Sequence, residues 1–428
     1  MNMKMKRLAV NVAAATAGLA ASNAMAAGFQ LLEQNASGLG NAYAGSAAVA
    51  ENASTIYFNP AGMTQLQARE MSMGLSLVRP SFKFSDQGSS AGVLSGGAKD
   101  AGGWAALPNG YISWALDKDV YVGVGLGAPF GLVTEYNRDW VGSAHSIKFE
   151  IKTYNINPSI AWRVNDTVSL GFGLNWQRME AEYTRRAGIF PAPPAPGPLS
   201  TSFATLDADD DSWGWNLGAL INLSESTRLG VSYRSKVKHE LTGSLKVEGP
   251  SPAFNAATSS GAKASVDLPD TFIFSLAHKL DPRWEVLADV SWTGWSSVDR
   301  VDILRTPSGA NVQTLDTDFQ DTWRFALGAN YQLNDAWKLK FGLAFDETPV
   351  KNAEKRLTSL PDNDRLWFSF GGQWKATKAA TLDMGVSYLY VSDTRINAGS
   401  PSDPTRGLVK GEYDSSVWIL GAQYSMAF

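Results

Sequence analysis

Apolar and polar residues alternate along many stretches of this chain. In the segment 335–346, every second residue is large and apolar, and the residues between are small or positively charged (Trp337, Leu339, Phe341, Leu343 and Phe345 against Ala336, Lys338, Lys340, Gly342 and Ala344). The same pattern recurs at 286–292, 382–390 and 418–428. A period of two residues is typical of β-strands with one apolar face. The pattern therefore predicts an all-β protein.

The lengths of these runs distinguish a membrane barrel from a soluble sandwich. The runs 146–164, 227–247 and 283–305 are much longer than the ~5–6 residues of a typical soluble strand. Short polar turns, such as 117–119, alternate with long loops rich in Pro, Gly and Ser. Trp residues recur near the ends of the runs (Trp114, Trp162, Trp284, Trp337 and Trp374). Alternating short and long connections and aromatic residues at the two interfaces are typical of outer-membrane β-barrels.

About 14 runs qualify as strands, which predicts a transmembrane antiparallel β-barrel over residues 69–428. An even number of strands closes an antiparallel barrel without leaving an unpaired edge in lipid. The predicted strands begin near Arg69, Leu107, Val120, His145, Thr167, Ser212, Thr227, Ala262, Arg283, Thr322, Asp335, Arg365, Ala379 and Gly407.

The first 68 residues do not follow the strand pattern. Residues 1–26 combine a basic start, an apolar stretch and the sequence Ala24-Met25-Ala26, which predicts a cleaved signal peptide. Residues 27–68 are rich in small residues but also contain large apolar ones, such as Phe29 and Phe58, that require a dry environment. We expect this segment to form a hatch inside the barrel lumen. The alternative is a disordered periplasmic tail.

Composition and charge exclude several classes of protein. The 428 residues include 37 Lys and Arg against 41 Asp and Glu, and no Cys, which excludes disulfides and thiolate metal sites. A net charge of −4 without basic runs argues against nucleic acid as a partner. The three histidines, His145, His239 and His278, stand beside no recognisable nucleophile motif or metal-ligand spacing. We therefore expect neither an enzyme nor a cofactor, and no metal site.

Several sequence blocks together resemble one known family. The blocks run from AGFQL at 27–31, SGLGNAYAG at 37–45 and NPA at 59–61 through NWQRMEAEYTRRAG at 175–188, YRSKVK at 233–238 and LPDTF at 268–272 to LPDNDRLWFSFG at 360–371. They are similar to the FadL-type long-chain fatty acid transporters of the Gram-negative outer membrane. The resemblance implies a 14-stranded barrel closed by an N-terminal hatch, and passive passage of hydrophobic molecules. We expect a monomer that binds a long-chain fatty acid or another hydrophobic small molecule and lies in outer-membrane lipid.

The resemblance also implies roles for particular residues. The hatch would contain Phe29 and the motif Asn59-Pro60-Ala61. Arg185 lies where the family carries a basic residue that binds the carboxylate, and its guanidinium suits that role because it is a planar fork that stays charged. The alternative for Arg185 is a place at the rim of the barrel. A second basic ligand of the family has no clear counterpart, since the stretch near Leu315 lacks a Lys.

A break is predicted in the third strand. Pro129 cannot donate a hydrogen bond to a β-ladder, and the surrounding glycines permit sharp changes of backbone direction. The run Ala128, Pro129, Phe130 and Gly131 matches the position where the family's third strand kinks inward and opens the wall towards lipid. We expect Asn59 to be the nearest polar side chain of the hatch. The alternative is an ordinary strand end.

Two long loops contain apolar residues. The loop 188–211 carries Ile189 and Phe190, and the loop 249–261 carries Phe254. We expect them to form an external capture surface for an apolar ligand; the alternative is that both are solvated loops. Two other functions fit the same fold: uptake of uncharged hydrocarbons, either monoaromatics or alkanes, and a structural barrel that transports nothing.

Overall fold

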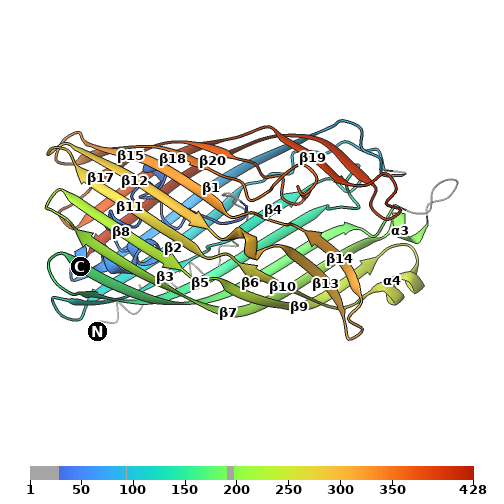
Figure 1. The fold of residues 1–428 in the computed structure, drawn as a ribbon, viewed down its shortest axis with the longest axis horizontal. Helices are drawn as coiled ribbons and strands as arrows, with labels where there is room; N and C mark the ends of the chain where they lie inside the picture. The colour runs from blue at the N-terminus through green and yellow to red at the C-terminus, as the bar shows by residue number, and fades with distance from the viewer. Residues whose placement is uncertain (1–27, 93, 190–196) are drawn as a thin grey trace.

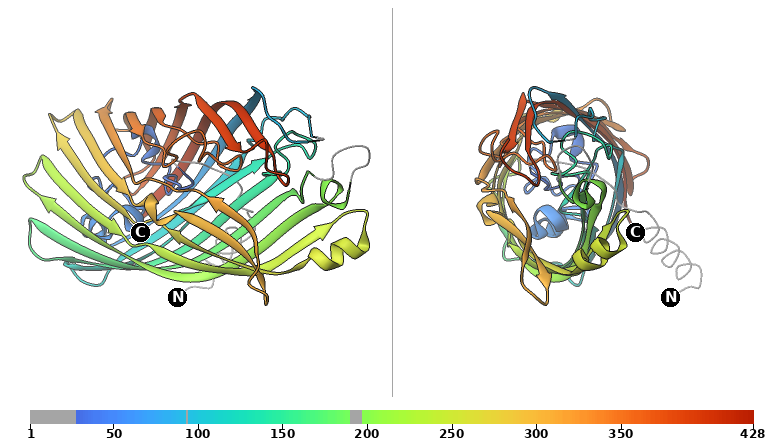
Figure 2. Two further views of the ribbon diagram at one scale, coloured as in Figure 1. Left: turned by 45° about the vertical axis from the view of Figure 1, so that its right-hand side comes forward. Right: turned by 90° about the vertical axis from the view of Figure 1, so that its right-hand side faces the viewer.

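The computed structural model describes residues 28–92, 94–189 and 197–428, and the predicted signal peptide lies outside them. Its strands form one antiparallel sheet that closes into a tall barrel (Figures 1 and 2). The first strand, β1 (Arg69–Asp86), pairs with the last, β20 (Leu408–Ala427), from Glu70↔Ala427 to Asp86↔Gly411. This pairing closes the sheet, as a barrel in lipid requires. The predicted all-β barrel is confirmed.

In the described part of the chain, the wall consists of 14 strands, as predicted. Besides β1 and β20, the continuous strands are β2 (Ala105–Ala115), β5 (Lys148–Arg163), β6 (Val168–Arg186), β7 (Phe203–Asn222), β16 (Trp337–Asp346) and β17 (Arg365–Lys375). Each of the others is interrupted once and forms two segments: β3 (Val120–Gly127) and β4 (Gly131–Glu135), β8 (Thr227–Arg234) and β9 (Val237–Glu248), β10 (Ser260–Leu268) and β11 (Thr271–Lys279), β12 (Trp284–Thr293) and β13 (Arg300–Thr306), β14 (Asn311–Asp316) and β15 (Thr322–Gln332), and β18 (Ala380–Val391) and β19 (Thr394–Gly399).

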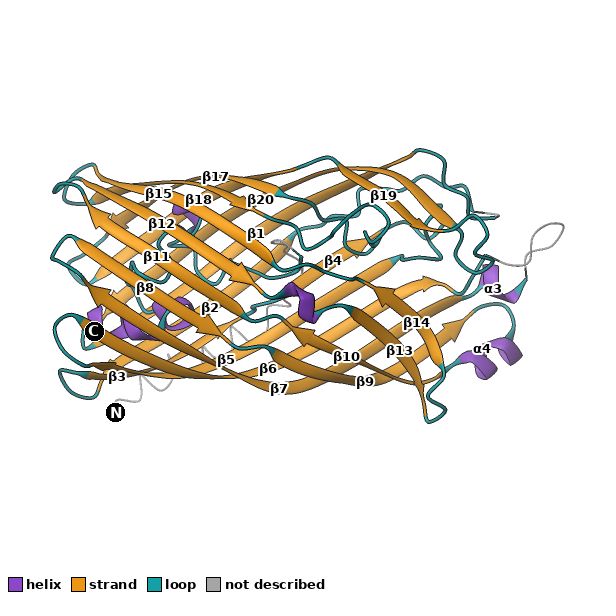
Figure 3. Cartoon of the chain, in the orientation of Figure 1, coloured by secondary structure: helices purple, strands orange, loops and turns teal. Residues whose placement is uncertain are grey.

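The helices are short and lie outside the wall's regular strands (Figure 3). The hatch segment contains η1 (Leu39–Asn41), α2 (Thr55–Phe58) and η2 (Pro60–Gln65), and η3 (Trp295–Ser297) interrupts a wall strand. The loops at one end of the barrel contain α3 (Pro198–Thr201) and α4 (Pro252–Thr258). None of the helices in the described ranges has the length and apolar character needed to cross a membrane.

The alternation along the strands sorts side chains between lipid and lumen. On β16, Phe341 and Leu343 point outward and are 39% and 57% exposed, whereas Lys340, which precedes Phe341, points inward and is 1% exposed. The apolar stripe seen in the sequence is therefore the lipid-facing surface, and the polar stripe lines the lumen.

Three predicted strands differ from the structure. β7 begins at Phe203 rather than near Ser212, because β6 continues to Arg186 and pairs with it there. In this extension the inward residues Ala204, Leu206 and Ala208 are apolar but are followed by Asp210, and the outward ones include Asp207 and Asp209, so the charged residues obscured the strand pattern. The runs 283–305 and 227–247 are not continuous: the second is interrupted between β8 and β9, and in the first η3 turns the chain and buries Trp295 inside the barrel.

The segment 28–68 lies inside the barrel (Figure 2, right-hand view) and contacts several sides of the wall. The Ala36 amide donates to Gln423 on β20 over 3.1 Å, and the Asn59 side chain donates to the Ala219 carbonyl on β7 over 2.9 Å. These bonds place the segment in the lumen, as predicted for a hatch, rather than in a free tail.

Ionic contacts also hold this segment. The Lys340 ammonium donates to Glu51 Oε1 over 2.5 Å, to the Ser37 carbonyl over 2.9 Å and to Asp383 Oδ1 over 2.9 Å. Lys340 and Asp383 belong to the wall, whereas Glu51 and Ser37 belong to the hatch segment. Removal of one partner leaves a buried charge uncompensated, which typically costs ~3–5 kcal/mol. The hatch is therefore strongly attached to the β16–β18 side of the wall.

Glycines in the wall make room for the hatch backbone. A Cβ atom on Gly342 would collide with Asn41, and one on Gly230 would collide with Ala47. Glycine usually weakens a strand, but it permits close approach of another backbone. These two positions, on β16 and β8, explain how the hatch backbone fits closely against two parts of the wall.

Candidate functional site

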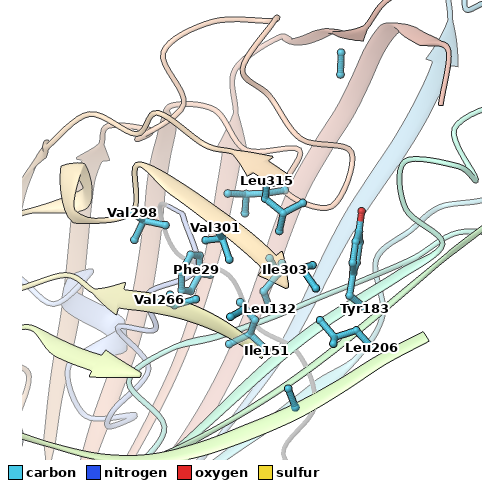
Figure 4. Close-up of a cluster of buried hydrophobic side chains, with 14 of the residues drawn as sticks. Phe29, Leu132, Ile151, Tyr183, Leu206, Val266, Val298, Val301, Ile303 and Leu315 are labelled. Atoms are coloured by element: carbon cyan, nitrogen blue, oxygen red, sulfur yellow. The ribbon is translucent and has the colours of Figure 1, made fainter. Parts of the chain in front are cut away.

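An apolar cavity of about 70 Å³ lies inside the barrel, next to the start of the hatch segment, and Figure 4 shows many of the side chains that line it. Its walls come from strands far apart in the sequence and from the first described residues of the chain. The lining includes Phe29, Leu132, Phe149, Ile151, Met179, Leu206, Leu241, Val266, Val298, Val301, Ile303, Leu315, Phe319 and Leu360. The described lining contains no charged side chain; Tyr183, Thr317 and Ser359 are its polar members. Such a cavity favours an apolar ligand, because burial of each CH₂ contributes ~0.8 kcal/mol.

Arg185 lies next to this cavity. It follows Tyr183 by two residues on β6, so both side chains are on the lumen side of the strand. The Arg185 Nη1 group donates to the carbonyls of Arg186 and Ala187, each over 3.0 Å. In the described ranges, neither its Nε nor its Nη2 group has a hydrogen-bond partner, and no carboxylate forms an ion pair with it. One edge of the guanidinium is thus available for a bidentate bond to a carboxylate.

The loops beyond the cavity add a second cation and a buried histidine. Arg406 already pairs with Asp403 over 3.4 Å. His145 lies 3.2 Å from the Gly407 carbonyl, and burial, together with the nearby positive charge of Arg406, lowers the pKa of His145 to about 4. The imidazole is therefore neutral at pH 7, and among the described residues Arg185 forms no ion pair with a carboxylate, unlike Arg406.

Three aromatic rings close the cavity on the hatch side. The Phe29 ring centroid lies 4.8 Å from that of Trp295 and 6.0 Å from that of Phe130, and the Phe130 and Trp295 centroids are 6.2 Å apart. Phe29 lines the 70 Å³ cavity, which we call the upper cavity. Trp295 lines a second cavity of about 40 Å³, which we call the lower cavity. We call these three rings the aromatic partition. Because the Phe29 and Trp295 rings are in contact, the two cavities adjoin at this partition.

Comparison with known proteins identifies the family of this barrel. Residues 17–428 match the family described as outer membrane protein transport protein (OMPP1/FadL/TodX). The chain belongs to this family. As a FadL/TodX-family protein, it is a transporter of hydrophobic compounds in the outer membrane of Gram-negative bacteria and not an enzyme.

The relatives of this chain in the FadL/TodX family include fatty acid and toluene transporters. The chain is 30% identical over 448 residues to the long-chain fatty acid transport protein of Salmonella typhi, covering 100% of both chains. It is 29% identical over 420 residues to outer membrane protein P1 of Haemophilus influenzae, covering 90% of both. Its fold resembles that of a Pseudomonas aeruginosa FadL homologue, with a TM-score of 0.84, 22% identity and coverage of 94% of this chain and 99% of that one. The Pseudomonas putida toluene transporter TodX has a TM-score of 0.65 at 16% identity, with coverage of 94% and 100%.

The FadL/TodX-family barrel is interrupted at the predicted kink. β3 pairs with β2 only as far as Leu126↔Gly110, and β4 pairs with β5 but not with β2. Between these segments, the Leu31 amide donates to the Pro129 carbonyl over 2.8 Å and the Gly131 amide donates to the Phe29 carbonyl over 2.9 Å. On the β2 side, the break at Ala128–Phe130 therefore pairs with the hatch segment instead of with the wall, while on the β5 side the Phe130 amide donates to the Thr153 hydroxyl over 2.9 Å.

The polar side chain at this break differs from the predicted one. Gln34 donates to the Ala128 carbonyl over 2.7 Å. Asn59 is instead directed to β7, and its Oδ1 accepts from the Ala61 amide over 3.1 Å at the start of η2. The prediction that Asn59 lies nearest to the opening is wrong, because the motif 59–61 packs against Gly171 on β6 and Gly218 on β7.

The apolar loop residues have different environments. Ile189 is 6% exposed, and its amide donates to the Thr405 carbonyl over 3.0 Å, so it lies beneath the loops rather than on an exposed surface. Phe190 lies outside the described residues. Phe254 is on α4, partly buried against the apolar core. Of the predicted external surface, Phe254 is the residue that the described structure leaves accessible.

Proposed function

We propose that this protein takes up long-chain fatty acids by passive diffusion. The observation that supports this most strongly is the free edge of the Arg185 guanidinium beside a cavity without charged walls. A fatty acid has one carboxylate and a long apolar tail, so it matches both features. Phe254 and its loop provide first contact with the ligand at the outer surface, and Arg185 with the cavity provides the internal site.

The exit of the ligand is lateral, through the break in the third strand. The hatch fills the lumen and is held by buried ionic contacts, so an axial route requires those contacts to break. At Pro129 and Gly131, by contrast, the described hatch contacts are main-chain hydrogen bonds with the short segment around Phe29 and Leu31, and Gln34 adds one side-chain bond to Ala128. Movement of that segment opens both the aromatic partition and the wall, so an apolar tail reaches the bilayer without crossing water.

Uptake of uncharged hydrocarbons is the second candidate. It is supported by the apolar lining of the upper cavity, which offers a monoaromatic or an alkane a complete binding surface without Arg185. A relative of the same fold is described as a toluene transporter, and another as a monoaromatic hydrocarbon channel.

Titration of the purified barrel with oleate, methyl oleate, toluene and a short sugar distinguishes these functions. For fatty acid uptake, oleate binds saturably and more tightly than its uncharged methyl ester, and the sugar does not bind. Equal affinity for oleate and methyl oleate, with saturable toluene binding, would instead support hydrocarbon uptake. If none of the four compounds binds saturably, the result would support a structural barrel that transports nothing.

A further inference from the structure

A second arginine without an acidic partner lies below the aromatic partition. Arg234 ends β8, with its side chain in the lumen. Its guanidinium donates to Asn175 Oδ1 and, over 2.9 Å, to the Tyr57 carbonyl, and its central carbon lies 4.1 Å from the Tyr57 ring centroid. Three of its five N–H groups have no partner among the described residues, and no described carboxylate pairs with it. An enclosed guanidinium without a counter-ion is costly, and stability does not account for it.

This arginine faces the lower cavity of about 40 Å³, which has room for roughly three water molecules or a single carboxylate. Gln30, Tyr57 and Trp295 form part of the lining. The other charged residues of the lining are Arg324 and Asp346, which are direct partners across β15 and β16. Because these two opposite charges face each other, the cavity keeps the net positive charge of Arg234.

A polar path connects Arg234 with the break in the third strand. Asn175, which accepts from Arg234, donates to Asn216 over 2.9 Å and accepts from Asn155 over 3.2 Å. Asn155 is the direct cross-strand partner of Gly127, the last residue before the break. Asn216 Nδ2 and Asn155 Oδ1 are buried without partners among the described residues. Buried polar groups normally have partners, so this row of amides has unused capacity for a polar ligand group or water.

We propose that Arg234 is a second carboxylate site, occupied after the ligand passes the aromatic partition and before it reaches the break. This inference rests on the proposed uptake of fatty acids. A carboxylate that leaves Arg185 must enter a region of apolar rings, where an unpaired charge is strongly disfavoured. Arg234 and the amide of Asn216 stabilise the carboxylate on the far side, while the tail still occupies the upper cavity.

Crystals soaked with 2-bromopalmitate test this inference. Its bromine is bonded to the carbon next to the carboxylate, so the anomalous signal marks the position of the head group. The protein has no Cys that the reagent could alkylate. We expect one bromine peak beside Arg185 and a second beside Arg234. In Arg234→Met the lower peak disappears and the upper one remains, whereas Arg234→Lys retains both.

Arg228→Met is the matched control. Arg228 is on the same strand and the same face, and it also donates to a hatch carbonyl, that of Val49, over 3.0 Å. If Arg234 only anchors the hatch, the two Met variants behave alike, and the inference is wrong. It is also overturned if the wild-type protein shows a peak beside Arg185 alone, which leaves the proposed function intact. If neither arginine has a bromine peak beside it, the proposed function itself is contradicted.

Discussion

Replacement of Arg185 by Ala is the most direct test of carboxylate binding. The structure shows that the Nη1 group of Arg185 holds the carbonyls of Arg186 and Ala187, while its Nε and Nη2 groups have no partner in the described part of the chain. The substitution therefore removes the free edge that we assign to the ligand. It leaves the apolar cavity, which Arg185 does not line, unchanged.

The expected loss follows from the bonds that the free edge can form. A hydrogen bond to a charged group contributes ~1.5–3 kcal/mol. This corresponds to oleate binding that is about 10- to 150-fold weaker in Arg185→Ala, at ~1.4 kcal/mol for each factor of ten. Methyl oleate has no carboxylate and is expected to bind the variant and the wild-type protein equally well. Arg185→Lys keeps the positive charge but loses the planar guanidinium that binds a carboxylate through two hydrogen bonds. We therefore expect the affinity of this variant for oleate to be intermediate.

Calorimetric titration of the detergent-solubilised protein at pH 8 measures these affinities, because oleate is ionised there. Arg406→Gln is the matched control, since Arg406 is a neighbouring cation that already pairs with Asp403 over 3.4 Å. We expect a much smaller effect from this control. Equal losses for oleate and methyl oleate in Arg185→Ala, or an equally large effect of Arg406→Gln, would refute the assignment.

Four further predictions concern processing, the hatch, the exit and pH. The intact mass of the outer-membrane protein is expected to begin at Ala27; retention of the first 26 residues would contradict the predicted signal peptide. Deletion of residues 29–65 is expected to raise the conductance of the barrel for small solutes in planar bilayers, and unchanged conductance would place the segment elsewhere. Combined replacement of Pro129 by Val and Gly131 by Thr is expected to reduce oleate uptake by cells while surface binding persists, because it restores a strand and crowds the hatch; full uptake in a folded variant would exclude the lateral route. Burial holds the pKa of His145 near 4, below its ordinary 6.5, so its stabilising contribution is present above pH 6.5 and is lost as the pH falls towards 4, by about 2 kcal/mol at pH 5; the protection of its loop amides against hydrogen exchange, relative to their intrinsic rates at each pH, should fall at pH 5, and His145→Gln should remove this dependence.

The wall of the barrel was largely predictable because its signal is local. Alternation depends only on residues two positions apart, so the lipid-facing stripe of β16 is visible in the sequence itself. The strand count and the break at Pro129 follow from the same kind of information, since proline lacks the donor that a ladder needs. The start of β7 was missed because charged outward residues, such as Asp207, remove the apolar half of the pattern.

The site depended on tertiary structure, because its parts are distant in sequence. Phe29, Ile151 and Val301 line one cavity only after the barrel closes and the hatch enters it. No local pattern distinguishes Arg185, with its free edge, from Arg406, which pairs with Asp403. For the same reason, the sequence alone predicted an exposed Ile189 that the loops bury. Periodicity determined which residues face inward, and the closed barrel decided which of them meet.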